Sequence, residues 1–191
     1  MDNIIRCFGN TPLYTDYHDN EWGRPVHDDR KLFEFLILEG AQAGLSWETV
    51  LKKRESYREA FDGFNPEKIV LYDEAKIEEL MANSGIIRNR LKINSVIINA
   101  GLFLDIQKQH GSFNKFIWAY VDNKPITNRV EKPEDWVATS PISDKISKDL
   151  KKLGFKFVGS TIIYAYMQAI GMVNDHLTSC FVYDEIKALS K

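Results

Sequence analysis

One cysteine and one histidine lie near each end of the chain, at spacings that could hold a metal ion. His176 and Cys180 are four residues apart, which on a helical turn places both side chains on one face. Cys7 and His18 lie eleven residues apart near the other terminus. Together they offer two sulfurs and two imidazoles, a closed set suited to structural zinc, with no open position for a zinc-dependent hydrolase. The alternative is a pair of buried thiols and two unrelated histidines.

A carboxylate on an apolar helix face is the second candidate for chemistry. Glu39 ends the run LFEFLILEG, on the face that carries Leu32 and Leu36. Burial there raises its affinity for a proton, because the ionised form loses its hydration. Glu39 is therefore either a structural carboxylate paired with N–H groups at a helix end before Gly40, or an acceptor that faces a ligand at the mouth of a pocket.

Aromatic residues occur in the sequence on both sides of this carboxylate. Tyr14, Tyr17 and Trp22 fall within PLYTDYHDNEWG, a polar stretch predicted to contain little helix, and Trp47 follows the loop AGLS. Any one of them could simply pack in the core. A group of them around one carboxylate would suit a planar base, stacked on its faces and hydrogen-bonded at its edge.

A glycine-bounded turn in LKKLGFKFVGS joins two predicted helices. Gly154 and Gly159 allow a tight turn and a close approach to a partner. The N–H groups of the helix that follows, from Ser160, form an anion site suited to phosphate. Basic residues gather here, at Lys145, Lys148, Lys151, Lys152 and Lys156. The alternative is a solvated helix face with a glycine stop, and a solvated face is also predicted for the second basic group, Arg88, Arg90 and Lys92.

The elements that must position these residues are predicted to be helices, because the apolar residues recur mostly at helical spacing. A helix follows Asp28 and Asp29, others begin at Ser46, Asn65, Asp73, Asn89, Ser112, Ser143 and Ser160, and the one from Asn89 runs to a stop at Gly111. Residues 121–142 lose this periodicity, contain three prolines and are predicted to form a long loop. The prediction is an all-α fold with a single domain over residues 1–191.

Composition removes several other classes of protein. The 191 residues carry a net charge of -2 and are 44% hydrophobic, which excludes a histone-like polycation and allows a sizeable core. No apolar run reaches the ~18 residues of a membrane span. The start, MDNIIRCFGN, lacks the features of a signal peptide, and the chain has only two cysteines. A monomer in a reducing cytoplasm is expected.

Several segments together resemble the DNA-3-methyladenine glycosylase I family: RCFG, PLYTDYHDNEWG, LEGAQAGLSWETVLKKRE, SGIIRNRLKI and LKKLGFKFVGSTIIYAYMQAIGMVNDH. The resemblance covers about residues 6–180. It implies a helix-hairpin-helix DNA glycosylase fold that flips a nucleotide out of alkylated double-stranded DNA. It also implies hydrolysis of the N-glycosidic bond, with free 3-methyladenine as the product.

The resemblance also implies roles for individual residues. Glu39 matches the pocket carboxylate that contacts the flipped base and is the candidate catalytic residue; Tyr17 and Trp47 match stacking residues, and Tyr14 and Trp22 match the pocket lining. One structural Zn²⁺ is expected on Cys7, His18, His176 and Cys180. The expected DNA contacts are Gly44 and Leu45, which would fill the hole left by the extruded nucleotide, and the hairpin residues Gly154, Lys156, Phe157 and Gly159.

The sequence also departs from the family and superfamily patterns. The segment from Cys7 to Tyr14 is shorter than usual, and Phe8 is judged a poor substitute for an aromatic residue expected there. Asp175, the nearest carboxylate after the second hairpin helix, is expected to point away. Thr161 stands where related lyases carry lysine, so strand cleavage is not expected. Two alternatives remain: a non-catalytic DNA-binding module, and a broader glycosylase that also releases 7-methylguanine.

Overall fold

The computed structural model describes residues 4–189, and these are mostly helical, as predicted. The helices are α1 (Pro12–Asn20), α2 (Asp29–Gln42), α3 (Trp47–Leu51), α4 (Arg54–Ala60), α5 (Pro66–Ile69), α6 (Glu74–Ala82), α7 (Arg90–His110), α8 (Phe113–Trp118), α9 (Pro141–Leu153), α10 (Ser160–Ala169) and α11 (Tyr183–Ala188). Short 3₁₀ turns cover Asp62–Phe64, Ala119–Val121 and Pro133–Asp135. Within the described part of the chain, no helix is both long enough and apolar enough to cross a membrane.

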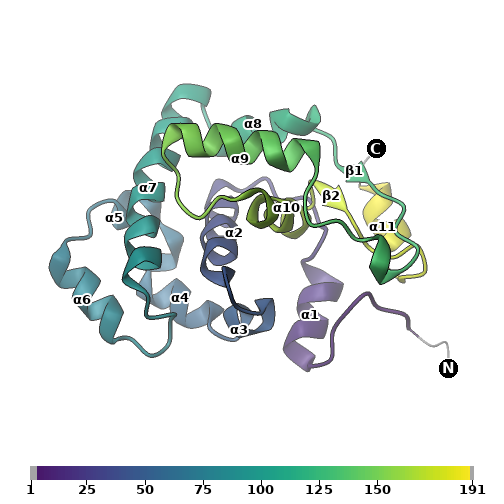
Figure 1. The fold of residues 1–191 in the computed structure, drawn as a ribbon, viewed down its shortest axis with the longest axis horizontal. Helices are drawn as coiled ribbons and strands as arrows, with labels where there is room; N and C mark the ends of the chain where they lie inside the picture. The colour runs from purple at the N-terminus through teal and green to yellow at the C-terminus, as the bar shows by residue number, and fades with distance from the viewer. Residues whose placement is uncertain (1–3, 190–191) are drawn as a thin grey trace.

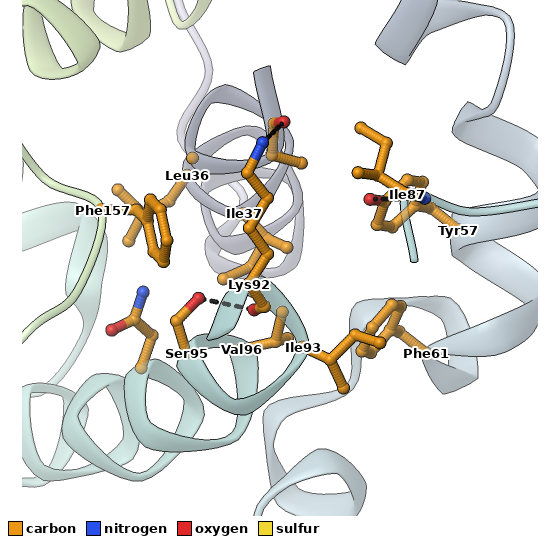
Figure 2. Close-up of a pocket in the computed structure, with 13 residues that line it drawn as sticks. Leu36, Ile37, Tyr57, Phe61, Ile87, Lys92, Ile93, Ser95, Val96 and Phe157 are labelled. Carbon is orange, nitrogen blue, oxygen red and sulfur yellow. Dashed lines mark hydrogen bonds between the residues drawn. The ribbon is translucent and has the colours of Figure 1, made fainter. Parts of the chain in front are cut away.

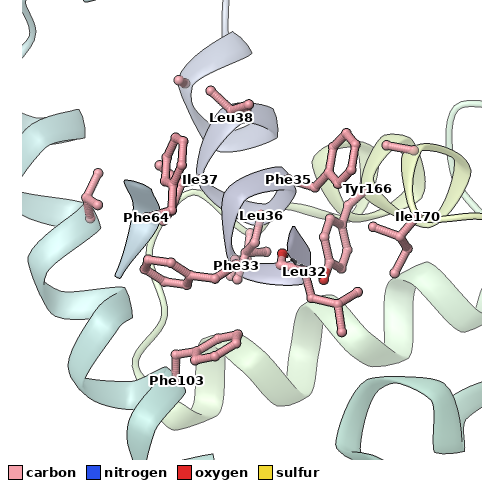
Figure 3. Packing of buried hydrophobic residues seen from close by; sticks show 14 of the residues in the cluster. Leu32, Phe33, Phe35, Leu36, Ile37, Leu38, Phe64, Phe103, Tyr166 and Ile170 are labelled. Carbon is pink, nitrogen blue, oxygen red and sulfur yellow. Dashed lines mark hydrogen bonds between the residues drawn. The ribbon is translucent and has the colours of Figure 1, made fainter. Parts of the chain in front are cut away.

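Helix α2 forms the centre of the molecule, with α7 on one side and α10 on the other (Figure 1). It is buried continuously from Leu32 to Ala41, so apolar side chains project from it in every direction (Figure 3). Phe33 meets Phe103 of α7 edge-on, with ring centroids 4.9 Å apart. The hydroxyl of Tyr166 on α10 donates to the carbonyl oxygen of Leu32. Glu39 is thus held on a helix that is buried over a continuous stretch from Leu32 to Ala41.

Most predicted helix starts are confirmed, because they depend on local capping chemistry. The side chains of Ser46, Asn65, Asp73, Asn89 and Ser112 each accept a hydrogen bond from a first-turn N–H group. Gly111 ends α7 in the left-handed conformation, as expected. The helix predicted from Ser46 is α3, which ends at Leu51 where the chain turns. A separate helix, α4, begins at Arg54 and pairs that side chain with Glu21 and Glu34.

Two predictions near the termini are wrong. The stretch predicted to contain little helix forms α1, since Thr11 caps it and Pro12 takes its first position. His176 and Cys180 do not lie on a helical turn. They follow β2 (Val173–Asn174), which pairs in parallel with β1 (Ile126–Thr127), and the amide of Thr178 donates to the carbonyl of Val130. This pairing with distant residues keeps the backbone extended before the turn.

The segment 121–142 is more ordered than a long loop. It contributes β1 and a 3₁₀ turn, and α9 begins at Pro141, two residues before the predicted start. Ser140 provides the cap, and its hydroxyl oxygen accepts from the amide of Ser143. Helix α11 was not predicted. Together with α1 it lies on the right side of the molecule in Figure 1, so helices from the first and last parts of the described chain share that side.

Candidate functional site

A cavity of about 290 Å³ opens between α1, α2, α3 and α10. The structure brings together here all five residues predicted to bind substrate, which are Tyr14, Tyr17, Trp22, Glu39 and Trp47. The volume lies close to the lower end of the range for small-molecule sites, about 300–1,000 Å³. The cavity is lined mainly by aromatic rings, with few polar groups.

Part of the aromatic wall comes from helix α1 and from the segment before it. Tyr14 and Tyr17 lie one helical turn apart, with ring centroids separated by 6.5 Å and planes inclined by 17°. Tyr17 also faces Trp47 at 5.4 Å. Phe8 stacks on Tyr14 at 4.7 Å and lines the cavity, so the expectation that it would be a poor substitute is wrong. The short segment between Cys7 and Pro12 folds back over α1 and places the Phe8 ring in the cavity lining.

Glu39 and Trp47 line this cavity, and each has one buried polar atom without a partner in residues 4–189. Oε2 of Glu39 and Nε1 of Trp47 are buried and have no hydrogen-bond partner within residues 4–189. Glu39 is only 4% exposed, and burial raises the pKa of its carboxyl to about 8. An unsatisfied buried polar atom costs about 1–3 kcal/mol, and such atoms mark sites that a ligand completes. Two residues of the cavity lining therefore retain free hydrogen-bonding capacity, one on a carboxyl oxygen and one on an indole N–H.

Other residues of the cavity were not identified from the sequence. Gln42, Trp136, Val137, Ala165 and Gln168 also line it. Trp136 comes from the segment predicted to be a long loop, and a tryptophan in so polar a segment is the one signal that could have pointed to it.

Asp175 lies behind the lining of the cavity and accepts hydrogen bonds from two of the lining residues. Its Oδ2 accepts from Nε2 of Gln168, and its backbone oxygen accepts from Nε1 of Trp136, each at 2.8 Å. The hydroxyl of Tyr164 and the amide of Asn128 donate to the same carboxylate. Asp175 is buried and is not part of the lining, in agreement with the expectation that it points away.

The four predicted metal ligands converge on one point. One ligand atom from each of Cys7, His18, His176 and Cys180 lies within 4.8 Å of all the others. Sγ of Cys7 is 3.4 Å from Nδ1 of His176, and Sγ of Cys180 is 3.5 Å from Nε2 of His18 and 3.6 Å from Nδ1 of His176. Metal bonds of about 2.0–2.3 Å place neighbouring ligands about 3.3–3.8 Å apart in a tetrahedron. This group could therefore hold a metal ion.

The surroundings of the cluster fix both imidazoles for such a role. Nδ1 of His18 lies 2.7 Å from Oδ1 of Asp19, and Nε2 of His176 lies 3.0 Å from the carbonyl oxygen of Trp22. Hydrogen bonds to the second ring nitrogen are usual for histidines that bind metals, because they set the tautomer and the ring orientation. The amide of Leu177 donates to Sγ of Cys7, which favours a thiolate.

The cluster and the cavity share a wall. Trp22 lines the cavity and meets the His176 ring at 4.5 Å, and Phe8 meets the His18 ring at 4.9 Å. The cluster joins residues near both ends of the described chain. Interactions that stabilise the cluster therefore also fix the positions of the Trp22 and Phe8 rings.

Two turns of the surface carry the predicted DNA contacts. The α2–α3 turn (residues 43–46) has Gly44 at a φ of 80° and leaves Leu45 41% exposed. The hairpin turn (residues 154–159) begins with Gly154, also in the left-handed region, and exposes Lys156. Phe157 is only half-exposed and packs on Gly40, where an added Cβ would come within 3.2 Å of it.

The second basic group does not form one solvated face. Arg88 and Arg90 are exposed, and Arg90 pairs with Glu74 and Glu78. Lys92 instead turns inward, and its ammonium donates to backbone oxygens at the end of α2. The prediction of a solvated face is wrong for Lys92, because these oxygens lie within its reach.

Comparison with known proteins gives matches over nearly the whole chain. A sequence model of the methyladenine glycosylase family matches residues 7–183. The DNA-3-methyladenine glycosylase of Haemophilus influenzae is 49% identical over 177 residues, which are 92% of this chain and 96% of that protein.

Solved structures give the same result. A crystal structure of 3-methyladenine DNA glycosylase I has a TM-score of 0.91 and 49% identity, covering 95% of this chain and 100% of that one. The enzyme from Staphylococcus aureus, solved for the structural basis of 3-methyladenine recognition, has a TM-score of 0.90 and 39% identity, covering 92% of this chain and 93% of that one.

Proposed function

The chain belongs to the methyladenine glycosylase family, and we propose that it acts in base-excision repair, with residues 1–191 as one domain that releases 3-methyladenine from alkylated double-stranded DNA. The observation that carries this proposal is the aromatic cavity with its two unpaired polar atoms, Oε2 of Glu39 and Nε1 of Trp47. A module that only binds DNA would gain nothing from burying both atoms at a cost in stability.

The cavity suits a positively charged purine. Methylation at N3 gives adenine in DNA a positive charge, which weakens its glycosidic bond. Electron-rich faces such as those of Tyr17 and Trp47 attract a cationic ring more than a neutral one. Glu39 adds an acceptor for the base edge and, once ionised, a negative charge in a poorly hydrated place. Selection of the damaged base therefore follows from charge as well as shape.

The proposed reaction is a hydrolysis with one bond broken in the nucleotide. The bond between C1′ of the sugar and N9 of the base breaks, and the electron pair leaves with the base, which thereby becomes neutral. Water adds to C1′ and loses a proton to solvent. We assign Glu39 to the stabilisation of the cationic base in the cavity and of the positive charge that develops on the sugar. Thr161 offers no amine for a covalent intermediate, so strand cleavage is not proposed.

We also propose that the Cys7, His18, His176 and Cys180 cluster holds a structural zinc ion. The mixed sulfur and nitrogen donors and the tetrahedral spacing support zinc over metals that prefer oxygen ligands. Bound zinc would supply cross-linking of the two ends of the chain. The residues around it would keep Phe8 and Trp22 in the wall of the cavity.

Burial of Glu39 leads to a prediction about pH. Because its pKa is raised to about 8 in the folded protein, the unfolded chain releases the proton first as pH rises. The carboxyl therefore lowers stability progressively from about pH 4.5 to pH 8, by about 1.4 kcal/mol per unit of pKa difference. Glu39→Gln is expected to match the wild type in urea unfolding at pH 4.5 and to be more stable by a few kcal/mol at pH 9. Equal stabilities at pH 9 would contradict the burial of an unpaired carboxyl.

The hairpin turn leads to a prediction about DNA affinity. In the described part of the chain no side chain caps the N–H groups at the start of α10, and Lys156 is exposed beside them. Lys156→Glu is expected to weaken binding to duplex DNA about tenfold or more at low salt, and to reduce the slope of log affinity against log salt by about 1. Lys187→Glu on α11 makes the same charge change away from the hairpin. If both variants bind like the wild type, the hairpin does not contact DNA.

A further inference from the structure

The two turns proposed to contact DNA are both attached to α7. Lys92 and Asn99 are seven residues apart on this helix, which is about two turns, so their side chains project from the same face. Lys92 reaches the end of α2, directly before the α2–α3 turn, and Asn99 reaches the hairpin turn. Three of the residues between them, Ile93, Ser95 and Val96, line a small cavity with α2 and Phe157 (Figure 2).

Lys92 closes the C-terminal end of α2. Its Nζ donates to the backbone oxygens of Ala41 and Ala43, both at 2.8 Å. The last carbonyl groups of a helix lack partners within the helix and carry the negative end of its dipole. The last turn of α2 has no basic residue of its own. Figure 2 shows Lys92 extended across the cavity toward this end of α2.

The charge of Lys92 is committed to these oxygens. No carboxylate pairs with it anywhere in residues 4–189, whereas Arg90, two residues earlier on the helix, pairs with two. Desolvation lowers the pKa of Lys92, which agrees with its half-buried position. A surface lysine that only attracted DNA would gain nothing from turning inward.

The side-chain amide of Asn99 binds the hairpin through both its oxygen and its nitrogen. Its Oδ1 accepts from the backbone N–H of Lys156 at 2.8 Å, and its Nδ2 donates to the backbone oxygen of the same residue at 3.0 Å. The side chain is buried. The residue that follows, Phe157, has a positive φ of 54° and packs on Gly40 of α2, which closes a ring of contacts between α2, α7 and the hairpin.

We infer that Lys92 and Asn99 are positioning residues that set the separation between the α2–α3 turn and the hairpin turn. They would thereby couple insertion of Leu45 into the space left by the extruded nucleotide to binding of the DNA phosphates by the hairpin. This inference rests on the proposed function. The physical reason is that nucleotide extrusion needs Leu45 and the phosphate-binding amides in place at the same time. Small displacements of such elements have large effects on rate.

Lys92→Met is the first test, because it keeps the length of the side chain and removes the ammonium. Single-turnover release of 3-methyladenine from methylated duplex DNA is expected to fall roughly 10- to 100-fold. Affinity for free 3-methyladenine, followed by tryptophan fluorescence, should stay within about twofold of wild type, since Lys92 does not line that cavity. Lys92→Arg should recover part of the rate. Arg90→Met removes one charge from the same helix and should leave both quantities unchanged.

Asn99→Ala tests the other attachment, with Asn94→Ala as its control on the same helix. Among the described residues, Oδ1 of Asn94 is buried without a partner, so its loss breaks no bond to either turn. Duplex release should fall for Asn99→Ala and not for Asn94→Ala.

The outcomes separate the inference from the function on which it rests. Wild-type release by both Lys92→Met and Asn99→Ala would overturn the inference, as would a parallel loss of free-base binding, which indicates collapse of the pocket. Absence of release by the wild-type protein in the same assay would instead overturn the proposed function.

Discussion

Replacement of Glu39 by glutamine is expected to slow the release of 3-methyladenine from duplex DNA by about 10²–10³-fold, the usual effect of losing one electrostatic contact to a developing charge. Glutamine keeps the shape and an acceptor oxygen but cannot become negative. In the free protein, burial keeps the pKa of this carboxyl near 8. A cationic base beside it favours the ionised form, so the carboxyl gives up its proton as the damaged nucleotide enters.

The matched control for this change is Glu48→Gln. Glu48 is a neighbouring carboxylate on α3, but it is paired with Lys52 and Thr11 and does not line the cavity. Single-turnover rates with saturating enzyme separate chemistry from binding for both variants. If the Glu39→Gln protein releases the base at the wild-type rate, the carboxylate has no role in catalysis, and recognition rests on stacking and on the indole N–H of Trp47.

The second large effect is expected at the metal cluster. Cys180→Ala should abolish stoichiometric zinc binding and lower the melting temperature by roughly 6–12 °C, corresponding to about 3 kcal/mol in a chain of this size. The reason is that the cluster joins the N-terminal segment and α1 to the segment before α11. Because Trp22 and Phe8 contact the two histidines, affinity for free 3-methyladenine should also fall.

The control for the metal prediction is His110→Ala, which removes an exposed histidine outside the cluster. Metal analysis of the purified proteins and thermal unfolding before and after chelation give the two readouts. Folded wild-type protein with far less than one equivalent of zinc, and no response of its melting temperature to chelators, would contradict the proposed zinc site.

The features of the fold that depend on neighbouring residues could be predicted from the sequence. Caps such as Asn89 and Ser112 act within one helical turn, so their residue types suffice to place α7 and α8. The same holds for the apolar face of α2, which identified Glu39 as a buried carboxylate. Polar composition failed as a guide at α1, because a single cap and a proline at the first position outweigh it.

Features set by distant contacts could not be predicted. The turn that carries His176 is fixed by pairing with β1, and no spacing rule connects those segments. Trp136 reaches the cavity because its indole donates to the backbone oxygen of Asp175. Lys92 turns inward because the end of α2 lies beside it. In each case the partner is separated along the chain by about 40–50 residues. The sequence gives the residue types, but it does not show which distant residues come into contact.

Whether the protein is a glycosylase is decided by analysing the bases that it releases from methylated duplex DNA, separated by chromatography. We expect free 3-methyladenine as the main product, with the DNA strand left intact at the abasic site. Release of 7-methylguanine at a comparable rate would show a broader glycosylase, against the selectivity proposed for the cavity. No released base from DNA that the protein binds would contradict the account and leave a DNA-binding protein with an unused pocket.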